Sequence, residues 1–227
     1  MDHPLMRQHS LTIDQTAALH AAAAHLEDEF TGVFNRESIE HFLASSYDQF
    51  AGHATVVNYL PLLAERFARQ RLQAFSRVEG FVADGKPVVL FLCVHNAGKS
   101  QMALGFFQAL AGDRAIAWSG GSEPGTSLNK HSVDAMAEVG IDITGEFPKP
   151  WTDETLRAAD VIVTMGCGDA CPVYPGKRYL DWDLQAPPGT SIENVRPVRD
   201  EIERRVRALL TELGVEVESS HSAEASA

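Results

Sequence analysis

Residues 88–103 read VVLFLCVHNAGKSQMA, and this stretch decides the fold. Val88–Leu92 is a short, continuous apolar run, which is typical of a strand buried on both faces of a parallel sheet. A loop of small residues follows, and a helix is expected from Ser100. Such a loop can point several backbone N–H groups, and the positive end of the helix dipole, at one spot. The stretch therefore predicts a cradle for an oxyanion.

Cys93 is the first residue of this loop. Amides and a helix N-terminus that face a thiol favour its nucleophilic thiolate form. Lys99 adds a positive charge, and Ser100 can hydrogen-bond the sulfur. A cysteine that only ends a buried strand is the alternative, because free cysteines are among the most buried residues. The sequence that follows Cys93 favours the nucleophile, and the His95 side chain is expected to point away from the anion.

Downstream of this stretch, apolar runs and helical patterns alternate. Strands are predicted at residues 88–92, 115–118, 161–165 and 178–181, and helices at 100–110, 130–139, 153–159 and 192–213. This alternation predicts an α/β fold with a four-stranded parallel sheet and helices on both faces. Ligands of such sheets bind beyond the carboxyl ends of the strands, where the Cys93 loop lies.

Upstream of residue 84, no segment favours a strand. Thr12 and Gln15 have the form of a capping box ahead of an Ala/Leu-rich run, and Asn35 can cap a second helix. Apolar residues from Leu60 onward recur at helical spacing. We expect a small three-helix bundle over residues 1–83, a second domain over 84–216 and a disordered tail over 217–227. Four arginines of the third helix, Arg66, Arg69, Arg71 and Arg77, are expected on a solvated face.

Composition limits the class of protein. The 227 residues carry a formal net charge of −12, which argues against a general nucleic-acid binder. No run approaches the ~18 to 20 apolar residues that cross a membrane, and no signal-peptide pattern opens the chain. We therefore expect a cytoplasmic protein with reduced thiols and no membrane partner. Its three cysteines do not resemble a disulfide framework, and no metal site is expected.

The other two cysteines, Cys167 and Cys171, follow the third predicted strand. In a parallel sheet, their loop opens on the same edge as Cys93. A disulfide requires Cα atoms within about 7 Å, so each thiol could meet Cys93 if the loop rearranges. Two buried structural thiols are the alternative interpretation.

Several separated motifs carry a resemblance to a known family. Cys93, five residues, a basic residue and Ser100 form a phosphate-loop signature, and the other motifs are SQMA at 100–103, SGGSEP at 119–124 and AMAEVGIDI at 135–143. The chain from about residue 87 to 214 resembles low-molecular-weight protein tyrosine phosphatases, and in particular the arsenate reductases related to them. The resemblance implies that Val94, His95, Asn96, Ala97, Gly98 and Lys99 bind the oxyanion substrate. The N-terminal helices resemble an extension found on some members.

The resemblance also implies a reaction. Cys93 would attack arsenate, Cys167 would attack the Cys93 sulfur to release arsenite, and Cys171 would leave a Cys167–Cys171 disulfide. Thioredoxin would reduce that disulfide by exchange, and no cofactor would be tightly bound. The Cys167–Cys171 spacing is shorter than in thioredoxin-coupled relatives, so a small thiol such as mycothiol is a second candidate donor.

The chain departs from the family pattern at three positions. Lys99 replaces an Arg whose planar fork grips two oxyanion oxygens. Ala186 replaces the Asp that acts as general acid, and Asp183 or Asp181 is a candidate substitute. Leu104 replaces a Glu that binds a cation in some members, so no such ion site is expected.

Two alternatives to arsenate reduction remain at this point. One is a tyrosine phosphatase that uses Cys93 alone. The other is a catalytically weak oxyanion- or arsenic-binding protein. A phosphatase relies on the Arg and the late Asp that this chain lacks, whereas the two additional cysteines favour reduction.

Overall fold

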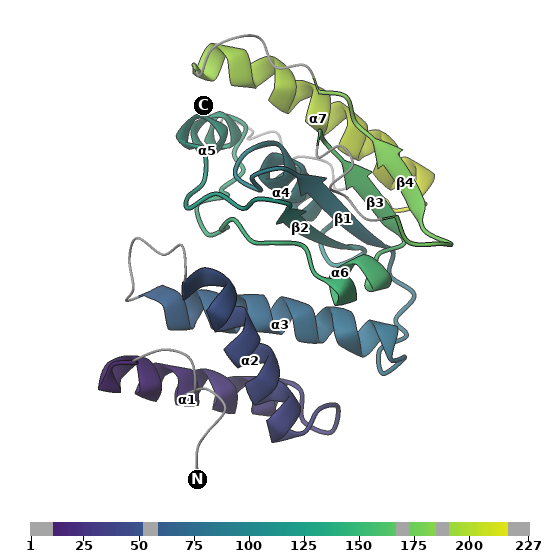
Figure 1. Cartoon of the computed structure of the whole chain (residues 1–227). Coiled ribbons are helices and arrows are strands. Elements are labelled where there is room, and N and C mark those ends of the chain that lie inside the picture. Colours follow the sequence, from purple (N-terminus) through teal and green to yellow (C-terminus); the bar gives the residue numbers. More distant parts are fainter. Residues whose placement is uncertain (1–10, 52–58, 167–172, 185–190, 218–227) are drawn as a thin grey trace, which may run out of the picture. The chain divides into compact units, whose positions relative to one another are not determined.

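The computed structural model describes residues 11–51, 59–166, 173–184 and 191–217. The chain divides into two compact units (Figure 1). The first comprises Met1–Asp84 together with Thr152–Ala158, and the second comprises Gly85–Trp151 together with Ala159–Ala227. Within the described residues, no helix is both long and apolar enough to cross a membrane.

The second unit contains the predicted four-stranded parallel sheet. Its strands are β1 (Val88–Cys93), β2 (Ile116–Gly121), β3 (Val161–Thr164) and β4 (Arg178–Asp181), in the order β2-β1-β3-β4. All six residues of β1 are buried, as its continuous apolar run predicts. Because β1 and β3 are parallel neighbours, the chain leaves both strands at the same edge of the sheet.

Helix α4 (Lys99–Ala111) packs against β1 and β2, and α5 (Lys130–Ala137) and α7 (Ile192–Glu212) pack against α4 and share the core of the sheet. Phe91 of β1 lies at the centre of their core, with its ring centroid 5.8 Å from that of Phe107 and 5.8 Å from that of Trp182. This core fixes β1 against α4, and therefore fixes both ends of the loop that joins them.

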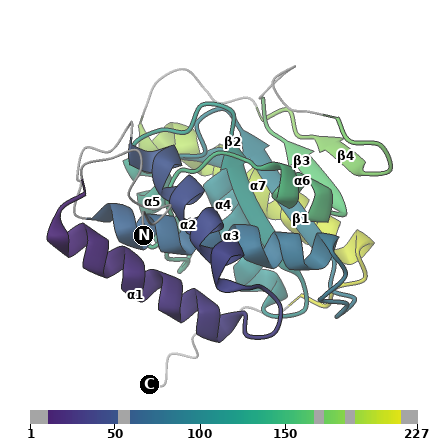
Figure 2. The ribbon, with the colours of Figure 1, turned by 60° about the horizontal axis from the view of Figure 1, so that its bottom comes forward.

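The three N-terminal helices are also confirmed. Helices α1 (Ile13–Glu29), α2 (Arg36–Ala51) and α3 (Leu60–Val78) lie side by side around their own apolar core (Figure 2). The Thr12–Gln15 capping box is formed at the start of α1. Asn35 accepts a hydrogen bond from the backbone N–H of Ser38 at the start of α2, as the sequence predicts.

Helix α6 (Asp153–Ala158) packs with α3 in the first unit, although its place in the sequence lies within the predicted second domain. Arg71 of α3 pairs with Glu154 of α6. The side chains of Arg71 and Arg77 are each 14% exposed, so the prediction of a solvated face was wrong for these two residues. Their charges are paired with Glu154 and Asp84, which sequence spacing alone does not reveal.

Candidate active site

The loop between β1 and α4 is held from its carbonyl side by the segment after β2. Four loop carbonyl groups accept backbone hydrogen bonds of 2.7–3.3 Å: Cys93 from Ser122, Val94 from Glu123, His95 from Gly125, and Ala97 from Asn129. In a trans peptide the C=O and the next N–H point in opposite directions. The loop therefore turns the N–H groups that follow these carbonyls toward its other side, which is the geometry that an oxyanion cradle requires.

Asn96 fixes the shape of the loop. It is fully buried and has a φ of 48°, in the left-handed region that Asn tolerates better than most residues. Its backbone N–H donates to the Cys93 Sγ at 3.2 Å, and its Nδ2 donates to the Ser100 Oγ at 2.9 Å. Its Oδ1 accepts from the backbone N–H of Lys149 at 3.0 Å. One side chain thus joins the loop, the start of α4 and a distant segment.

Cys93 ends β1 with its side chain at the base of the loop. Its Sγ lies 3.0 Å from the Ser100 Oγ, the contact that the sequence predicts. The first turn of α4 begins at Lys99, so the sulfur also lies beside a helix N-terminus. A hydroxyl, a backbone amide and a helix dipole around one sulfur stabilise a negative charge there.

Gly121 and Gly98 allow this close packing. A Cβ on Gly121 would lie 2.6 Å from the Val94 carbonyl oxygen, and a Cβ on Gly98 would lie 3.0 Å from the Ser132 Oγ. The loop can approach β2 and α5 closely because these positions have no side chain.

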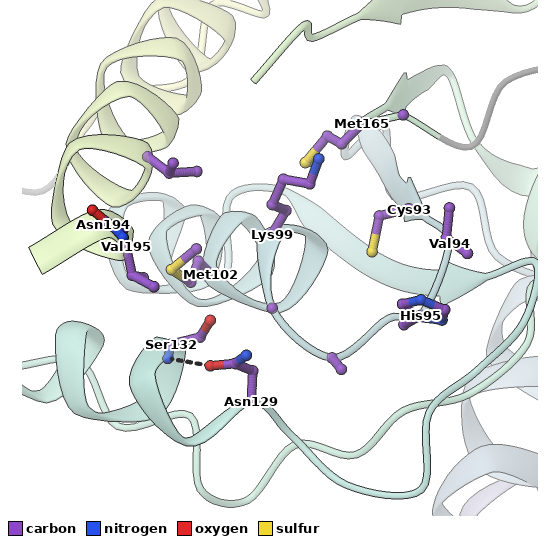
Figure 3. A pocket seen from close by; sticks show the side chains of 14 residues that line it. Cys93, Val94, His95, Lys99, Met102, Asn129, Ser132, Met165, Asn194 and Val195 are labelled. Carbon is purple, nitrogen blue, oxygen red and sulfur yellow. Dashed lines mark hydrogen bonds between the residues drawn. The ribbon is translucent and has the colours of Figure 1, made fainter. Parts of the chain in front are cut away.

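Lys99 extends from the start of α4 alongside Met165, at the end of β3 (Figure 3). Its Nζ lies 3.6 Å from the position that a Cβ on Gly166 would occupy. The ammonium group therefore borders the point where the chain leaves β3.

A cavity of about 370 Å³ opens above Cys93 (Figure 3). The loop forms one side of it, and the first turns of α5 and α7 form the other. Its lining residues are Cys93, Val94, His95, Ala97, Gly98, Lys99, Met102, Asn129, Ser132, Met165, Gly166, Asn194, Val195 and Val198. Asn129 caps α5, accepting from the backbone N–H of Ser132 at 3.1 Å. The cavity therefore extends from the Cys93 loop to residues of α5 and α7.

Six of the predicted site residues line this cavity: Cys93, Val94, His95, Ala97, Gly98 and Lys99. Asn96 and Ser100 are fully buried and do not line the cavity. The His95 Nδ1 lies 3.1 Å from the Glu123 carbonyl oxygen. Asp181 accepts a hydrogen bond from the Thr164 Oγ1 at 2.7 Å, and neither Asp181 nor Asp183 is among the lining residues. Cys167, Cys171 and Ala186 lie outside the described residues.

Gln101 and Lys149 hydrogen-bond the Cys93 loop, and the sequence did not predict these contacts. The Gln101 Nε2 donates to the backbone oxygen of Asn96 at 3.0 Å and to that of Phe147 at 3.0 Å. Lys149 binds the Asn96 side chain through its backbone N–H, and its carbonyl accepts from the Gly121 N–H at 2.9 Å. The left-handed preference of Asn could have identified Asn96 as a turn residue. No local signal identifies Lys149, because its contacts lie far away in the sequence.

An ion-pair group joins α5 and α7 beside the cavity. Arg196 and Arg199 hydrogen-bond Glu138, at 2.5 Å from the Arg196 Nη2 and 2.9 Å from the Arg199 Nη1. Hydrogen bonding from Arg196, and then from Arg199, lowers the pKa of Glu138 to about 2. Across the described ranges, no cluster of three or more His, Cys, Asp or Glu side chains could hold a metal ion.

Comparisons with known proteins agree with this geometry. The family model for low molecular weight phosphotyrosine protein phosphatases matches residues 88–219. A model for a protein-tyrosine-phosphatase-like N-terminal domain matches residues 19–76. The thioredoxin-dependent arsenate reductase of Corynebacterium glutamicum superposes with a TM-score of 0.79 at 40% identity, over 88% of this chain and 98% of that one.

Two curated relatives match about half of this chain. An arsenate reductase of Halalkalibacterium halodurans is 38% identical over 54% of this chain and 94% of its own length. Arsenate reductase 1 of Staphylococcus epidermidis is 36% identical over 53% of this chain and 93% of its own length. The chain therefore belongs to the low molecular weight phosphotyrosine protein phosphatase family, as a member that is similar to arsenate reductases and carries the phosphatase-like N-terminal domain.

Proposed function

We propose that the chain is an arsenate reductase in which the Cys93 thiolate is the nucleophile. The observation that carries this proposal is the surroundings of the Cys93 sulfur. Ser100 and the Asn96 amide contact it, and the loop carbonyls are turned away from the cavity. The similarity to arsenate reductases supports the choice of substrate. Val94, His95, Asn96, Ala97, Gly98 and Lys99 would hold the arsenate oxygens, mainly through backbone N–H groups.

The first step forms a covalent adduct. The Cys93 thiolate attacks As(V), an S–As bond forms, and one arsenate oxygen leaves as water after protonation. Asp183 or Asp181 is the proposed proton source in place of the family Asp, although reaching the substrate requires a different position from the one described. The Lys99 ammonium would supply positive charge without the two-point grip of an Arg.

The second stage is a relay of thiols. The Cys167 thiolate attacks the Cys93 sulfur, the S–As electron pair passes to arsenic, and arsenite leaves. Cys171 then attacks Cys167, which releases the Cys93 thiolate and leaves a Cys167–Cys171 disulfide. The parallel pairing of β1 and β3 supports this route, because Gly166, the residue before Cys167, lines the cavity that contains Cys93.

The electron donor is proposed to be thioredoxin, on the basis of the thioredoxin-dependent relative. A small thiol such as mycothiol is the second candidate, and it would attack an arsenylated Cys93 from the cavity that Cys93 lines. Both donors are reducing systems of the cytoplasm, which is the proposed location.

The test is arsenite formation from arsenate, measured with thioredoxin and its reductase and, separately, with mycothiol and its reducing partner. Cys93→Ser, Cys167→Ser and Cys171→Ser are assayed in parallel, together with hydrolysis of an aryl phosphate. Thioredoxin-driven turnover that needs all three cysteines would support the relay. Turnover with mycothiol alone that survives Cys171→Ser would replace the relay with direct thiol attack.

Hydrolysis of the aryl phosphate without arsenite formation would instead identify a phosphatase. Tight oxyanion binding without either reaction would identify a binding protein. Each outcome separates one of the alternatives that the sequence leaves open.

A further inference from the structure

The first turn of α7 is only partly held by its own helix. Pro197 lies inside α7 and has no N–H to donate to the carbonyl of Glu193, four residues earlier. Ser191, the N-cap residue, makes no side-chain hydrogen bond that caps the helix. Residues 192–196 therefore depend on tertiary contacts for their position more than the later turns of α7 do.

This turn forms part of the cavity wall. Asn194 and Val195 line the cavity on the side opposite the Cys93 loop (Figure 3). Cys93 also lines the cavity and is only 5% exposed, so a reactant must enter the cavity to meet its sulfur. The position of the turn therefore affects how wide this approach is.

Helix α5, which also contributes to the wall, is fixed to the Cys93 loop. The backbone N–H of Asn129, at its N-cap, donates to the Ala97 carbonyl at 2.7 Å. The Ser132 Oγ lies 3.0 Å from the position that a Cβ on Gly98 would occupy. A contact from α7 to α5 therefore fixes the first turn of α7 relative to the loop as well.

An ion pair provides this contact. Arg196 donates to both carboxylate oxygens of Glu138 on α5, from Nε at 2.9 Å and from Nη2 at 2.5 Å. Arg199 donates to the same carboxylate at 2.9 Å. A single exposed ion pair contributes little, but a two-point pair within a network favours one geometry. Because Arg196 precedes Pro197 and Arg199 follows it, the Arg196–Glu138 pair joins the first turn to α5 across the interruption in the helix.

We infer that Arg196 and Glu138 are positioning residues for the cavity: their pair holds the first turn of α7 against α5 and so limits the size of the reactant that reaches Cys93. The pair would favour compact reactants such as arsenate over bulky organic ones. This inference rests on the proposed function, in which Cys93 is the thiol that reacts in the cavity.

The test compares how fast Cys93 reacts with a small and with a bulky thiol reagent, iodoacetamide and N-pyrenylmaleimide. It uses the full chain with Cys167→Ser and Cys171→Ser, so that only Cys93 reacts. Each rate constant is divided by that of free cysteine with the same reagent at the same pH. Both reagents react with the same thiolate, so the ratio of the bulky to the small reagent measures access to the sulfur and not the fraction of thiolate.

Arg196→Gln is expected to raise this ratio about two- to fivefold, which is the change in population that the loss of a surface ion pair allows. Glu138→Gln should raise it at least as much, because it also weakens the bond to Arg199. The double variant should match Glu138→Gln alone, since both changes break one contact. Arg196→Lys should give a smaller rise, because Lys pairs as a point charge.

Pro197→Ala should act in the opposite direction. Alanine restores an N–H that can donate to the Glu193 carbonyl, which ties the first turn to the rest of α7. Combined with Arg196→Gln, it should reduce the rise in the ratio.

Arg204→Gln is the matched control. Arg204 lies farther along α7, pairs with Glu201 at 2.7 Å and does not line the cavity. This variant should keep the ratio of the starting chain.

An unchanged ratio in folded Arg196→Gln and Glu138→Gln chains would overturn the inference, and so would an equal rise in Arg204→Gln. Melting temperatures identify a variant that has unfolded, and Arg196→Lys then decides the question. Protection of Cys93 from iodoacetamide by phosphate tests the proposed function separately. Without such protection the oxyanion cradle would fail, while the ratio would still decide whether the wall limits access. A starting chain whose Cys93 reacts with neither reagent would overturn both.

Discussion

The two units hold their distant segments together by different kinds of contact. In the second unit, backbone groups bind backbone groups: four carbonyls of the Cys93 loop accept from residues 122–129. In the first unit, the helices satisfy their own backbone groups, so their mutual contacts are apolar side chains and ion pairs such as Arg69–Glu29. The loop should therefore tolerate side-chain changes that leave its backbone in place. The helices should respond mainly to changes of side chain.

The largest expected effect comes from replacing Asn96, whose side chain hydrogen-bonds the backbone N–H of Lys149 and the Ser100 hydroxyl. Asn96→Ala removes the acceptor of the Lys149 N–H and the donor to Ser100, and it places Ala in the left-handed region. Buried groups without partners cost about 1–3 kcal/mol each, so we expect about 3–5 kcal/mol of lost stability. Turnover should fall about 10²-fold because the sulfur is misaligned.

Asn35→Ala is the control for this change, because Asn35 caps α2 in the first unit. It should cost about 1 kcal/mol and leave Cys93 reactivity unchanged. Urea unfolding and iodoacetamide alkylation measure both quantities. If Asn96→Ala and Asn35→Ala slowed alkylation of Cys93 equally, the effect of Asn96 would not be specific to the loop that contains Cys93.

Gly121→Ala should have the next largest effect. Its Cβ would lie 2.6 Å from the Val94 carbonyl oxygen and 3.0 Å from the Asn96 nitrogen, so the loop must move. We expect a loss of about 1–3 kcal/mol and about a tenfold fall in arsenite formation. Gly145→Ala is the matched control, since a Cβ there meets nothing within 4 Å. A fully active Gly121→Ala variant would show that the loop is not held as tightly as its bonds suggest.

Lys99→Arg tests how much a side chain can increase oxyanion affinity in a cradle that consists of backbone N–H groups. A guanidinium that binds two oxyanion oxygens should gain about 1 kcal/mol, which is about a fivefold lower inhibition constant for phosphate. Lys130→Arg should change nothing, because Lys130 is 81% exposed and pairs with Asp134 on the surface. If phosphate binds no more tightly to the Lys99→Arg variant, the backbone alone sets oxyanion affinity.

The smallest effect is expected at the ion pairs between α5 and α7. The pKa of Glu138 is lowered from 4.5 to about 2 by Arg196 and then Arg199, so its pairs stabilise the fold above about pH 4.5. This contribution is lost as the pH falls toward 2. Glu138→Gln should therefore be less stable than wild type in urea near neutral pH, and the difference should vanish near pH ~2. A difference that stays constant with pH would mean that the carboxylate charge has no part in it.

Much of the second unit could be predicted from local pattern. The apolar run at Val88–Leu92 predicted a central buried strand, and the small residues before Ser100 predicted the loop at its carboxyl end. The Cys93–Ser100 contact followed from their positions on that loop. These features depend on residues near one another in the sequence, so composition and spacing are sufficient to find them.

The remaining features depend on contacts between distant residues. Asn96 and Lys149 are 53 residues apart, and Arg71 and Glu154 are 83 apart. No periodicity links such positions. Helix α6 was assigned to the sheet region by its place between predicted strands, whereas its packing partner is α3. Arg71 was expected on a solvated face because clustered charges on a helix usually face solvent, and its acidic partner Glu154 lies 83 residues away.

The distance between Asn96 and Lys149 has a consequence for biosynthesis. While the ribosome synthesises the chain, Cys93 emerges long before the segment that orients Asn96 and before β3, which pairs with β1. Until that later segment arrives, the Asn96 Oδ1 lacks its hydrogen bond from the Lys149 N–H, and β1 lacks its neighbour β3. The complete set of contacts around the Cys93 loop can therefore form only after residue 164, at the end of β3, has been synthesised.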